Sequence, residues 1–336
     1  MDIVEQILLE DNIEEAYSKT QKSKAKYKQQ AIEFSRNETV NLRILREELK
    51  HQTYQPSNHN KFFVYEPKLR LIYSPTYRDK IVHHAVNNVL RDIVEPTFIY
   101  DSYACIRDKG NQKAVRRLLY FTRKASRVYF NPYVIKMDIE KFFYTINHDV
   151  MCDIIDMKID NSWLQWILKL YVRNSPTSQG LPLGNLLSQI LVNVMMNVFD
   201  QWCKRTLKVK FYLRYSDDVI AIVDGKEQAR QTRDKMKSFI EEVLLLRVHP
   251  KKTVIHPLSQ NLKAFGFSIN PRGIFMTQET RQRVSKKLSE TNSSDVATSL
   301  IQWLQVSSSR RDIHRIAFSR GWSLIYRGMK FYKAVV

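Results

Sequence analysis

Two adjacent aspartates, Asp217 and Asp218, are the residues of this sequence best suited to chemistry. They interrupt an apolar, β-branched and aromatic segment, 211–223, and this pattern predicts a β-hairpin with the acids at its turn. Adjacent carboxylates repel each other, so a hydrophobic setting favours a divalent cation as their counter-charge. For the tetrapeptide 215–218 alone, a solvated turn is the simpler interpretation, and the rest of the sequence has to decide.

A third acid, Asp138, ends the apolar run 134–139, which is predicted to be a buried strand. A lone buried carboxylate is costly, but the cost falls if Asp138 shares a cation with Asp217 and Asp218. Three carboxylates can hold two Mg²⁺ ions about 3.5–4 Å apart, one activating an attacking hydroxyl and one neutralising a leaving diphosphate. For Asp138 alone, a strand-end cap or a salt bridge is an equal alternative.

Between these acids lies a loop rich in glycine and proline, 178–189, that leads into a predicted long helix. Gly180 and Gly184 would let the backbone approach a ligand closely. Ser188 is predicted to be the N-cap of the helix, whose first amides would face an anion or a base. An ordinary loop and cap is the alternative.

The elements that must position these residues alternate between helices and strands. Helical apolar spacing predicts helices over 37–50, 78–94, 147–172, 188–207 and 226–246. Short strands are predicted as a hairpin over 61–75 and as a pair over 262–269, and the chain from 277 on is basic and mostly helical. This pattern indicates an α+β architecture.

Composition narrows the class of partner. The 336 residues are 43% hydrophobic, as in a globular protein, and carry a net charge of +20, which points to a polyanion. The three cysteines have no metal-type spacing and fit a reducing compartment. Neither a signal peptide nor an apolar run of about 18 residues is visible, so we expect a cytoplasmic protein without a membrane span.

Taken in order, the motifs resemble the palm of a reverse transcriptase. They are Asp-x-x-x-Phe-Phe from Asp138, the Leu-Pro-x-Gly loop, Tyr-x-Asp-Asp, a Lys-Thr and Phe-Gly-Phe, and the match runs from about 61 to 269. The resemblance implies a right-hand polymerase fold with fingers, an antiparallel palm sheet and a helical thumb. It implies an N-terminal helical extension over 1–60, fingers and the start of the palm over 61–135, palm over 136–270 with fingers helices near 147–175, and thumb over 271–336.

The resemblance also assigns the chemistry. Asp138 and Asp217 would be metal ligands, Asp218 the third acid, and the carbonyl of Ile139 would complete one metal shell. Lys252 would protonate the departing diphosphate, with the adjacent Lys251 as its rival. The cofactor would be two Mg²⁺ ions, with Mn²⁺ as the alternative.

Substrate contacts follow from the same resemblance. Arg70 would grip the triphosphate, with Lys68 a weaker candidate, and the Phe143 ring would exclude a 2′-hydroxyl. Arg107 would contact template or nucleotide. The remaining positions are loop residues near the nucleotide, and a hairpin at the primer end: Leu183, Gly184, Ser188 and Gln189 in the loop, and Phe265, Gly266 and Phe267 in the hairpin. Partners would be dNTPs, template RNA and the cDNA or RNA–DNA duplex.

The form Leu-Gly-x-x-x-Ser-Gln at Leu183–Gln189 resembles reverse transcriptases of diversity-generating retroelements of bacteria or phages. Those enzymes copy a template RNA inaccurately at adenines for mutagenic retrohoming, with a small, basic, oligomeric accessory protein. Leu183 lacks a hydrogen-bonding group, and a site that loses such a bond discriminates less, so we predict that it lowers fidelity. Retron, group II intron-like and abortive-infection enzymes are alternatives. An RNA-binding scaffold without catalysis is an alternative of a different class.

Overall fold

The chain folds into two compact units that are each built from separate stretches of sequence. The computed structural model describes residues 2–22, 28–65, 69–291, 293–309, 313 and 316–317. We call Met1–Tyr100, Ile139–Trp202 and Lys237–His249 the helical unit, and Asp101–Asp138, Cys203–Met236 and Pro250–Val336 the sheet unit. The predicted subdomain boundaries divide the chain by function and stay a prediction, and part of the predicted thumb and Lys68 lie outside the described residues.

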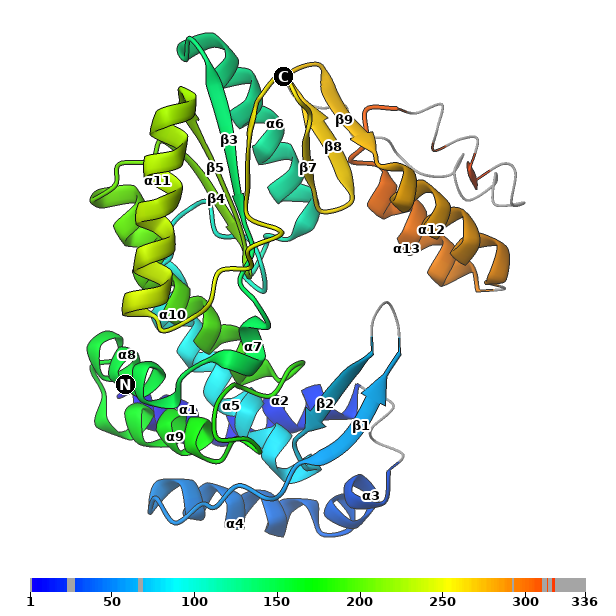
Figure 1. The fold of residues 1–336 in the computed structure, drawn as a ribbon. Coiled ribbons are helices and arrows are strands. Elements are labelled where there is room, and N and C mark those ends of the chain that lie inside the picture. The colour runs from blue at the N-terminus through cyan, green and yellow to red at the C-terminus, as the bar shows by residue number, and fades with distance from the viewer. Residues whose placement is uncertain are drawn as a thin grey trace. The chain divides into compact units, whose positions relative to one another are not determined.

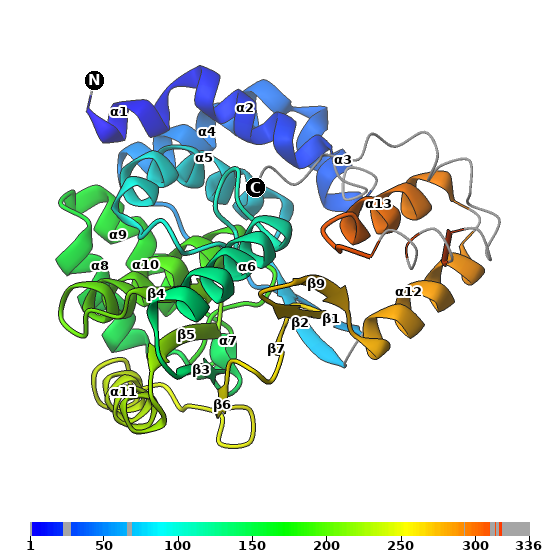
Figure 2. The ribbon, with the colours of Figure 1, turned by 90° about the horizontal axis from the view of Figure 1, so that it is seen from above.

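Helices dominate the helical unit, and α5 is central among those from the N-terminal part. The elements are α1 (Ile3–Leu8), α2 (Glu10–Gln21), α3 (Gln29–Arg36), α4 (Glu38–Lys50), β1 (Asn60–Val64), β2 (Arg70–Ser74), α5 (Tyr77–Val94), η2 (Glu95–Thr97), α7 (Phe142–Thr145), α8 (His148–Lys158), α9 (Ser162–Arg173), α10 (Leu186–Arg205) and η3 (Phe239–Val243). Helices α1, α2 and α3 pack against α5, and Figure 2 shows α1 and α2 beside it. The apolar stripe predicted for α5 is buried at Ile81, Ala85 and Leu90, as helical spacing requires.

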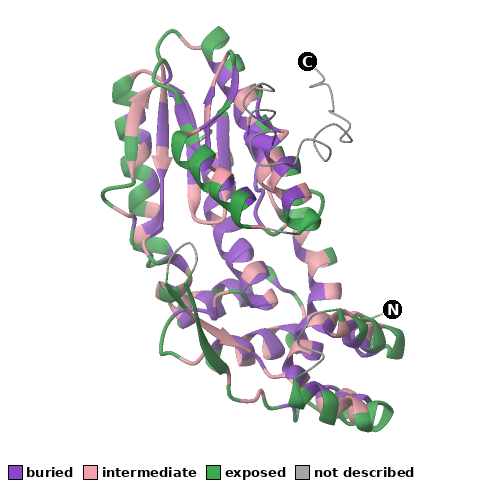
Figure 3. Ribbon diagram, turned by 90° about the vertical axis from the view of Figure 1, so that its right-hand side faces the viewer, coloured by how far each residue is buried: buried purple, intermediate pink, exposed green. Residues whose placement is uncertain are grey.

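Strands β1 and β2 form the predicted hairpin, which is the most exposed pair among the strands that the structure describes (Figure 3). All five residues of β1 are exposed, and Phe62 lies opposite Ile72 in the antiparallel register. The hairpin therefore gains little from burial, and its base has to be held by other contacts.

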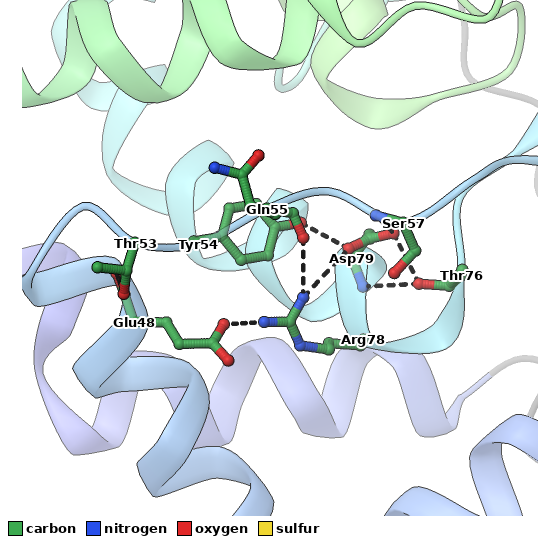
Figure 4. Close-up of polar contacts among 8 residues, drawn as sticks. All are labelled: Glu48, Thr53, Tyr54, Gln55, Ser57, Thr76, Arg78 and Asp79. Carbon is green, nitrogen blue, oxygen red and sulfur yellow. Dashed lines mark hydrogen bonds and ion pairs between the residues drawn. The ribbon is translucent and has the colours of Figure 1, made fainter.

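One buried carboxylate, Asp79, holds that base (Figure 4). Its side chain accepts hydrogen bonds from the Tyr54 hydroxyl at 2.6 Å, the Ser57 amide at 3.1 Å and the Thr76 hydroxyl at 2.7 Å. Thr76 is also the N-cap of α5 and accepts from the Asp79 amide. Arg78, ion-paired with Glu48, lies 3.8 Å from Asp79. The segments before and after the hairpin are thus tied to one side chain.

Two antiparallel sheets form the sheet unit (Figure 1). Strands β3 (Pro132–Met137), β4 (Phe211–Tyr215), β5 (Asp218–Asp224) and β6 (Val254–Pro257) pair in the order β4-β5-β3-β6. Strands β7 (Leu262–Ala264), β8 (Phe267–Asn270) and β9 (Gly273–Met276) form the second sheet. The helices are α6 (Asn111–Val128), α11 (Lys226–Ser238), α12 (Gln278–Glu290) and α13 (Ser294–Leu304). Apolar side chains of α6, both sheets, α12 and α13 form one core.

Several predicted elements change at their ends. The helix predicted over 147–172 is two helices, because Asn161 caps α9 by accepting from the Leu164 amide at 2.9 Å. The helix predicted over 226–246 leaves the α conformation after Ser238 and continues as η3, and the predicted strand pair gains β9 as a third strand. None of the described helices is long and apolar enough to cross a membrane.

Candidate active site

The three predicted acids come together at one end of the sheet. Strands β4 and β5 pair so that Tyr215 faces Asp218, which leaves Ser216 and Asp217 as a two-residue turn. Strand β3 lies beside β5 with Met137 opposite Val219, so Asp138 follows β3 at the end where the turn lies. The hairpin predicted from the sequence is confirmed, and the strand next to it carries the third acid.

Two lysines supply positive charge to these acids. The Lys252 ammonium donates to both carboxylate oxygens of Asp138, at 2.9 and 3.0 Å, and Asp138 is only 8% exposed. The Lys136 ammonium lies 3.8 Å from Asp218 and donates to the Lys263 carbonyl at 3.3 Å. The salt bridge considered as an alternative for Asp138 is therefore present, and its partner is the lysine predicted to act in the reaction.

Burial and mutual repulsion shift the pKa of both turn acids upward. For Asp217, burial raises the pKa most, and the charge of Asp138 raises it further. For Asp218, burial and the charges of Asp217 and Asp138 outweigh Lys136 and raise the pKa to about 6. An added cation would relieve this repulsion.

The donor chemistry of the cluster fits Mg²⁺. Carboxylate oxygens are the ligands that hard divalent cations prefer, and burial together with the charge of Asp138 raises the pKa of Asp217 and of Asp218. Within the described part of the chain, no group of three or more His, Cys, Asp and Glu side chains is arranged as a metal site, and Lys252 contacts Asp138 instead. Asp138, Asp217 and Asp218 are thus the residues that would hold the ion.

A fully buried arginine, Arg214, is hydrogen-bonded to the acidic turn. Its guanidinium donates to the Ser216 carbonyl at 3.1 Å and to the Ser102 hydroxyl at 3.0 Å. Its backbone joins the segment Asp101–Tyr103 through the Arg214 amide to the Asp101 carbonyl at 2.9 Å. Ser216 has a φ of 56°, a left-handed conformation that costs a non-glycine residue about 1–2 kcal/mol. Arg214 therefore anchors the strained residue directly before Asp217.

The predicted primer-end hairpin lies next to the same turn. The Phe265 ring is 4.9 Å from the Tyr215 ring, measured between centroids. Gly266, with a φ of 84°, gives room to α12 and α13, since an added Cβ would lie 2.7 Å from the Thr280 hydroxyl. Phe267 is fully buried, so its side chain belongs to the core. Arg107 is exposed in the turns before α6, still in the sheet unit.

In the helical unit, the predicted nucleotide loop packs onto α7. The Leu181 amide donates to the Phe143 carbonyl at 2.7 Å, and His148 donates through Nε2 to the Gly180 carbonyl at 2.7 Å. A Cβ at Gly180 would lie 2.8 Å from the Phe143 carbonyl oxygen. The close approach predicted for this glycine is therefore to the chain's own backbone, and the half-buried Phe143 is brought beside the loop.

Ser188 is not the N-cap of α10, because the helix begins at Leu186. Ser188 is fully buried, donates to the Pro182 carbonyl at 2.7 Å and lies 2.6 Å from the Tyr171 hydroxyl. Its side chain therefore fixes the loop. Gly184 is exposed and turns the chain with a φ of 85°.

The other predicted residues of the helical unit are more dispersed. Leu183 and Gln189 are half-buried, and the exposed Arg70 is the first residue of β2. Next to it, the Leu71 carbonyl accepts from the Tyr144 hydroxyl at 3.4 Å, which connects β2 to α7. Ile139 is buried and pairs with Val248 in an isolated bridge, so its role as a carbonyl ligand stays a prediction.

Sequence reasoning missed Lys136, Arg214 and Tyr171. Lys136 stands two residues before Asp138 on a strand, a spacing that places both on one face, and this signal was readable. Arg214 interrupts an apolar strand, which indicates a buried charge with fixed partners. Tyr171 gives no such signal, because its contact with Ser188 joins two different helices, α9 and α10, and the sequence does not show that they lie together.

Comparison with known proteins identifies the protein family of this chain. Residues 58–269 match the reverse transcriptase (RNA-dependent DNA polymerase) family. The chain belongs to this family and is, by family, an RNA-directed DNA polymerase.

Relatives of known sequence include two bacterial proteins. The chain is similar to protein YkfC of Escherichia coli, 26% identical over 258 residues that cover 64% of this chain and 68% of YkfC. It is similar to the group II intron-encoded protein LtrA of Lactococcus lactis, 24% identical over 300 residues that cover 67% of this chain and 49% of LtrA. The match thus spans about half of LtrA.

Solved telomerases share the fold. Apo telomerase from Candida tropicalis superposes with a TM-score of 0.55 at 14% identity, covering 82% of this chain and 60% of that chain. Telomerase from Candida albicans in complex with a telomeric RNA fragment gives 0.53 at 11% identity, covering 84% and 58%. The predicted α+β right-hand polymerase fold is confirmed.

Proposed function

We propose that this chain synthesises cDNA on a template RNA by two-metal nucleotidyl transfer. The observation that carries the proposal is the gathering of Asp138, Asp217, Asp218 and Lys252 in one unit of a reverse-transcriptase fold. Reverse transcriptases generally use divalent metal ions. When bound, Mg²⁺ would activate the primer hydroxyl and neutralise the leaving diphosphate. Asp138 and Asp217 would hold it with the Ile139 carbonyl, and Asp218 would support them.

In this proposal Lys252 interacts with two groups, Asp138 and the departing diphosphate. In the structure it neutralises Asp138. With the acids holding a cation, the Lys252 ammonium would be available to donate a proton to the departing diphosphate as a general acid.

Substrate contacts are proposed from the predicted positions. Arg70 binds the triphosphate, and Phe143 lies beneath the sugar and selects deoxynucleotides. Leu183, Gly184 and Gln189 face the nascent pair, while Ser188, being buried, acts through the loop that it fixes. Arg107, Phe265 and Gly266 contact template or primer, and Phe267 supports them from the core.

Primer extension on RNA with Mg²⁺ and dNTPs tests the polymerase proposal. Asp217→Asn removes the charge and keeps the shape, so incorporation should fall by at least 10³-fold, whereas Asp234→Asn on the exposed face of α11 should extend normally. Equal incorporation by the wild type and Asp217→Asn would refute two-metal catalysis through Asp217, and RNA binding without incorporation by the wild type would favour an RNA-binding scaffold.

We further propose a diversity-generating retroelement as the biological setting, on the strength of Leu183 and Ser188-Gln189. The enzyme would then misincorporate at template adenines and act with a small basic accessory protein. Sequencing cDNA made by the wild type and by Leu183→Gln tests this, since the glutamine variant should make fewer errors opposite adenine. An unchanged error rate would remove Leu183 from the explanation.

A group II intron-like setting is the second candidate, because LtrA and two putative yeast COX1/OXI3 intron proteins are similar to this chain. Neighbouring DNA discriminates between the two. A pair of repeats that differ mainly at adenines supports diversification, and intron boundaries around the gene support the intron.

A further inference from the structure

Helix α6 carries an unusual division of side chains between its two faces. One face is buried in the core of the sheet unit through Ala114, Leu118, Phe121 and Ala125. The opposite face, which we call the α6 basic face, has cations and one tyrosine at helical spacing. Its members are Lys113, Arg116, Arg117, Tyr120, Arg123, Lys124 and Arg127.

Among the residues that the structure describes, most of these cations have no carboxylate partner. The α6 sequence contains no Asp or Glu. Arg117 pairs with Asp101 at 2.7 Å, but within the described ranges Arg116, Arg123, Lys124 and Arg127 make no ion pair. Helix α11 behaves differently, because three of its cations lie near acids of the same helix or of η3: Arg230 with Glu227, Arg233 with Asp234 and Lys237 with Glu241.

The tyrosine in the middle of the face contacts two of the cations. Arg117 lies 4.9 Å and Lys124 5.9 Å from the centroid of the Tyr120 ring, which stays 46% exposed. From Lys113 to Arg127 the face extends over roughly 21 Å at the α-helical rise of 1.5 Å per residue. Double-stranded DNA carries a charge about every 1.7 Å of its axis, and on that scale a duplex segment of this length presents several phosphates.

We propose that the α6 basic face binds the phosphate backbone of a double-stranded part of the template RNA. Arginines predominate, and their planar guanidinium groups suit phosphate oxygens in bidentate geometry. The sites lie on a rigid helix whose other face is fixed in the core. This inference goes beyond polymerisation, because it assigns a docking surface on the face of α6 opposite its buried side chains, and it rests on the proposed RNA template. At one edge of that face the Arg123 guanidinium also donates to the Pro271 carbonyl at 3.0 Å.

Other partners fit this face less well. A membrane-binding helix inserts its apolar face, and that of α6 is already buried in the core. A protein partner would have to place acidic groups opposite these cations, since like charges facing each other across an interface disfavour binding. The small basic accessory protein proposed above would be repelled by a row of cations.

Charge-matched variants of two helices test the proposal. The α6 variant combines Arg116→Gln, Arg123→Gln, Lys124→Gln and Arg127→Gln. The α11 control variant combines Arg230→Gln, Arg233→Gln, Lys235→Gln and Lys237→Gln, so it loses the same four charges. The probe is a blunt RNA duplex of about 20 base pairs with blocked 3′ ends, titrated over a range of salt without dNTPs.

We expect the α6 variant to bind the duplex at least 10-fold more weakly at about 150 mM salt, and the α11 variant within 3-fold of wild type. The salt slope should fall only for the α6 variant, by up to about 0.9 for each phosphate that the variant no longer neutralises. Circular dichroism and thermal melting confirm that both variants are folded. Equal losses, no loss, or loss of binding only to an added protein would each overturn the proposal.

Failure here is separable from failure of the polymerase proposal. Duplex binding is measured on Asp217→Asn as well, which cannot extend a primer but keeps α6 intact. Primer extension on a short primer–template should be normal for the α6 variant at saturating substrate. A wild type that binds the duplex without extending primers would refute polymerisation and leave the docking surface standing.

Discussion

Replacing Arg214 by methionine should loosen the acidic turn and also destabilise the fold around it. The substitution keeps an unbranched side chain in the core but removes the donors to the Ser216 carbonyl and the Ser102 hydroxyl. Hydrogen bonds from a charged group are worth about 1.5–3 kcal/mol each, so the gross loss is about 3–6 kcal/mol. Relief from burying the charge offsets part of it, and we expect a net destabilisation of about 3 kcal/mol.

Metal binding is the readout that separates positioning from stability. The left-handed φ of Ser216 stores about 1–2 kcal/mol, and without Arg214 the turn can relax and carry Asp217 with it. We therefore expect at least about 10-fold weaker Mn²⁺ binding, equivalent to 1.4 kcal/mol, measured by electron paramagnetic resonance on folded protein. Urea unfolding measures stability in parallel.

Two further variants make that prediction refutable. Ser102→Ala removes the outer partner of Arg214 and leaves its bond to Ser216, so Mn²⁺ affinity should stay within about 2-fold of wild type. Arg214→Lys keeps the charge with a shorter reach and should be intermediate. If Arg214→Met loses stability but binds Mn²⁺ as tightly as wild type, Arg214 does not position the turn.

Four further outcomes follow from contacts at the site and the hairpin. Burial and the neighbouring acids raise the pKa of Asp218 to about 6, so the folded state loses stability as pH rises from about 4 to 6. Asp218→Asn should therefore raise metal-free stability at pH 8 by up to about 3 kcal/mol and leave it unchanged near pH 4. Melting curves that show an equal gain at both pH values would contradict this. Lys252→Met should slow nucleotide incorporation by about 10²–10⁴-fold with modest change in primer–template affinity, and an unchanged rate would assign the proton to another group. Gly180→Ala should cost more than 2 kcal/mol in urea unfolding, since its Cβ meets fixed backbone at Phe143, whereas a neutral change would show that the loop can shift. Asp79→Ala should lower stability by about 2–4 kcal/mol because three donors lose their acceptor, and a loss below about 0.5 kcal/mol would mean that the hairpin base is held elsewhere.

The sequence was most informative where chemistry and local pattern coincide. The hairpin at 211–223 could be predicted because an apolar run lies on either side of two acids, so the two runs can pair as strands with the acids at the turn. The structure confirms this pairing. Asp138 and Lys252 were both predicted as site residues, and their direct contact links positions 114 apart in the chain. The order of motifs supplied the fold, which no single motif could have done.

Tertiary contacts explain what could not be predicted. Ser188 has the residue type of an N-cap, yet the buried contacts with Pro182 and Tyr171 place it inside the helix. Gly180 has the residue type of a ligand-binding loop, yet its close neighbour is the backbone of Phe143. In both cases the local signal was real, but the partner came from a distant element.

Because of the Asp79 contacts, the β1–β2 hairpin can unfold while α5 stays folded. Ser57 and Thr76 are both bonded to Asp79 outside the strands, so breaking the ladder between β1 and β2 leaves α5 and its cap intact. Amide protons of the hairpin should therefore exchange through a local opening, faster than those of α5, whose apolar side chains are buried. The protein would contain a segment that folds and unfolds many times during the lifetime of one global folded state.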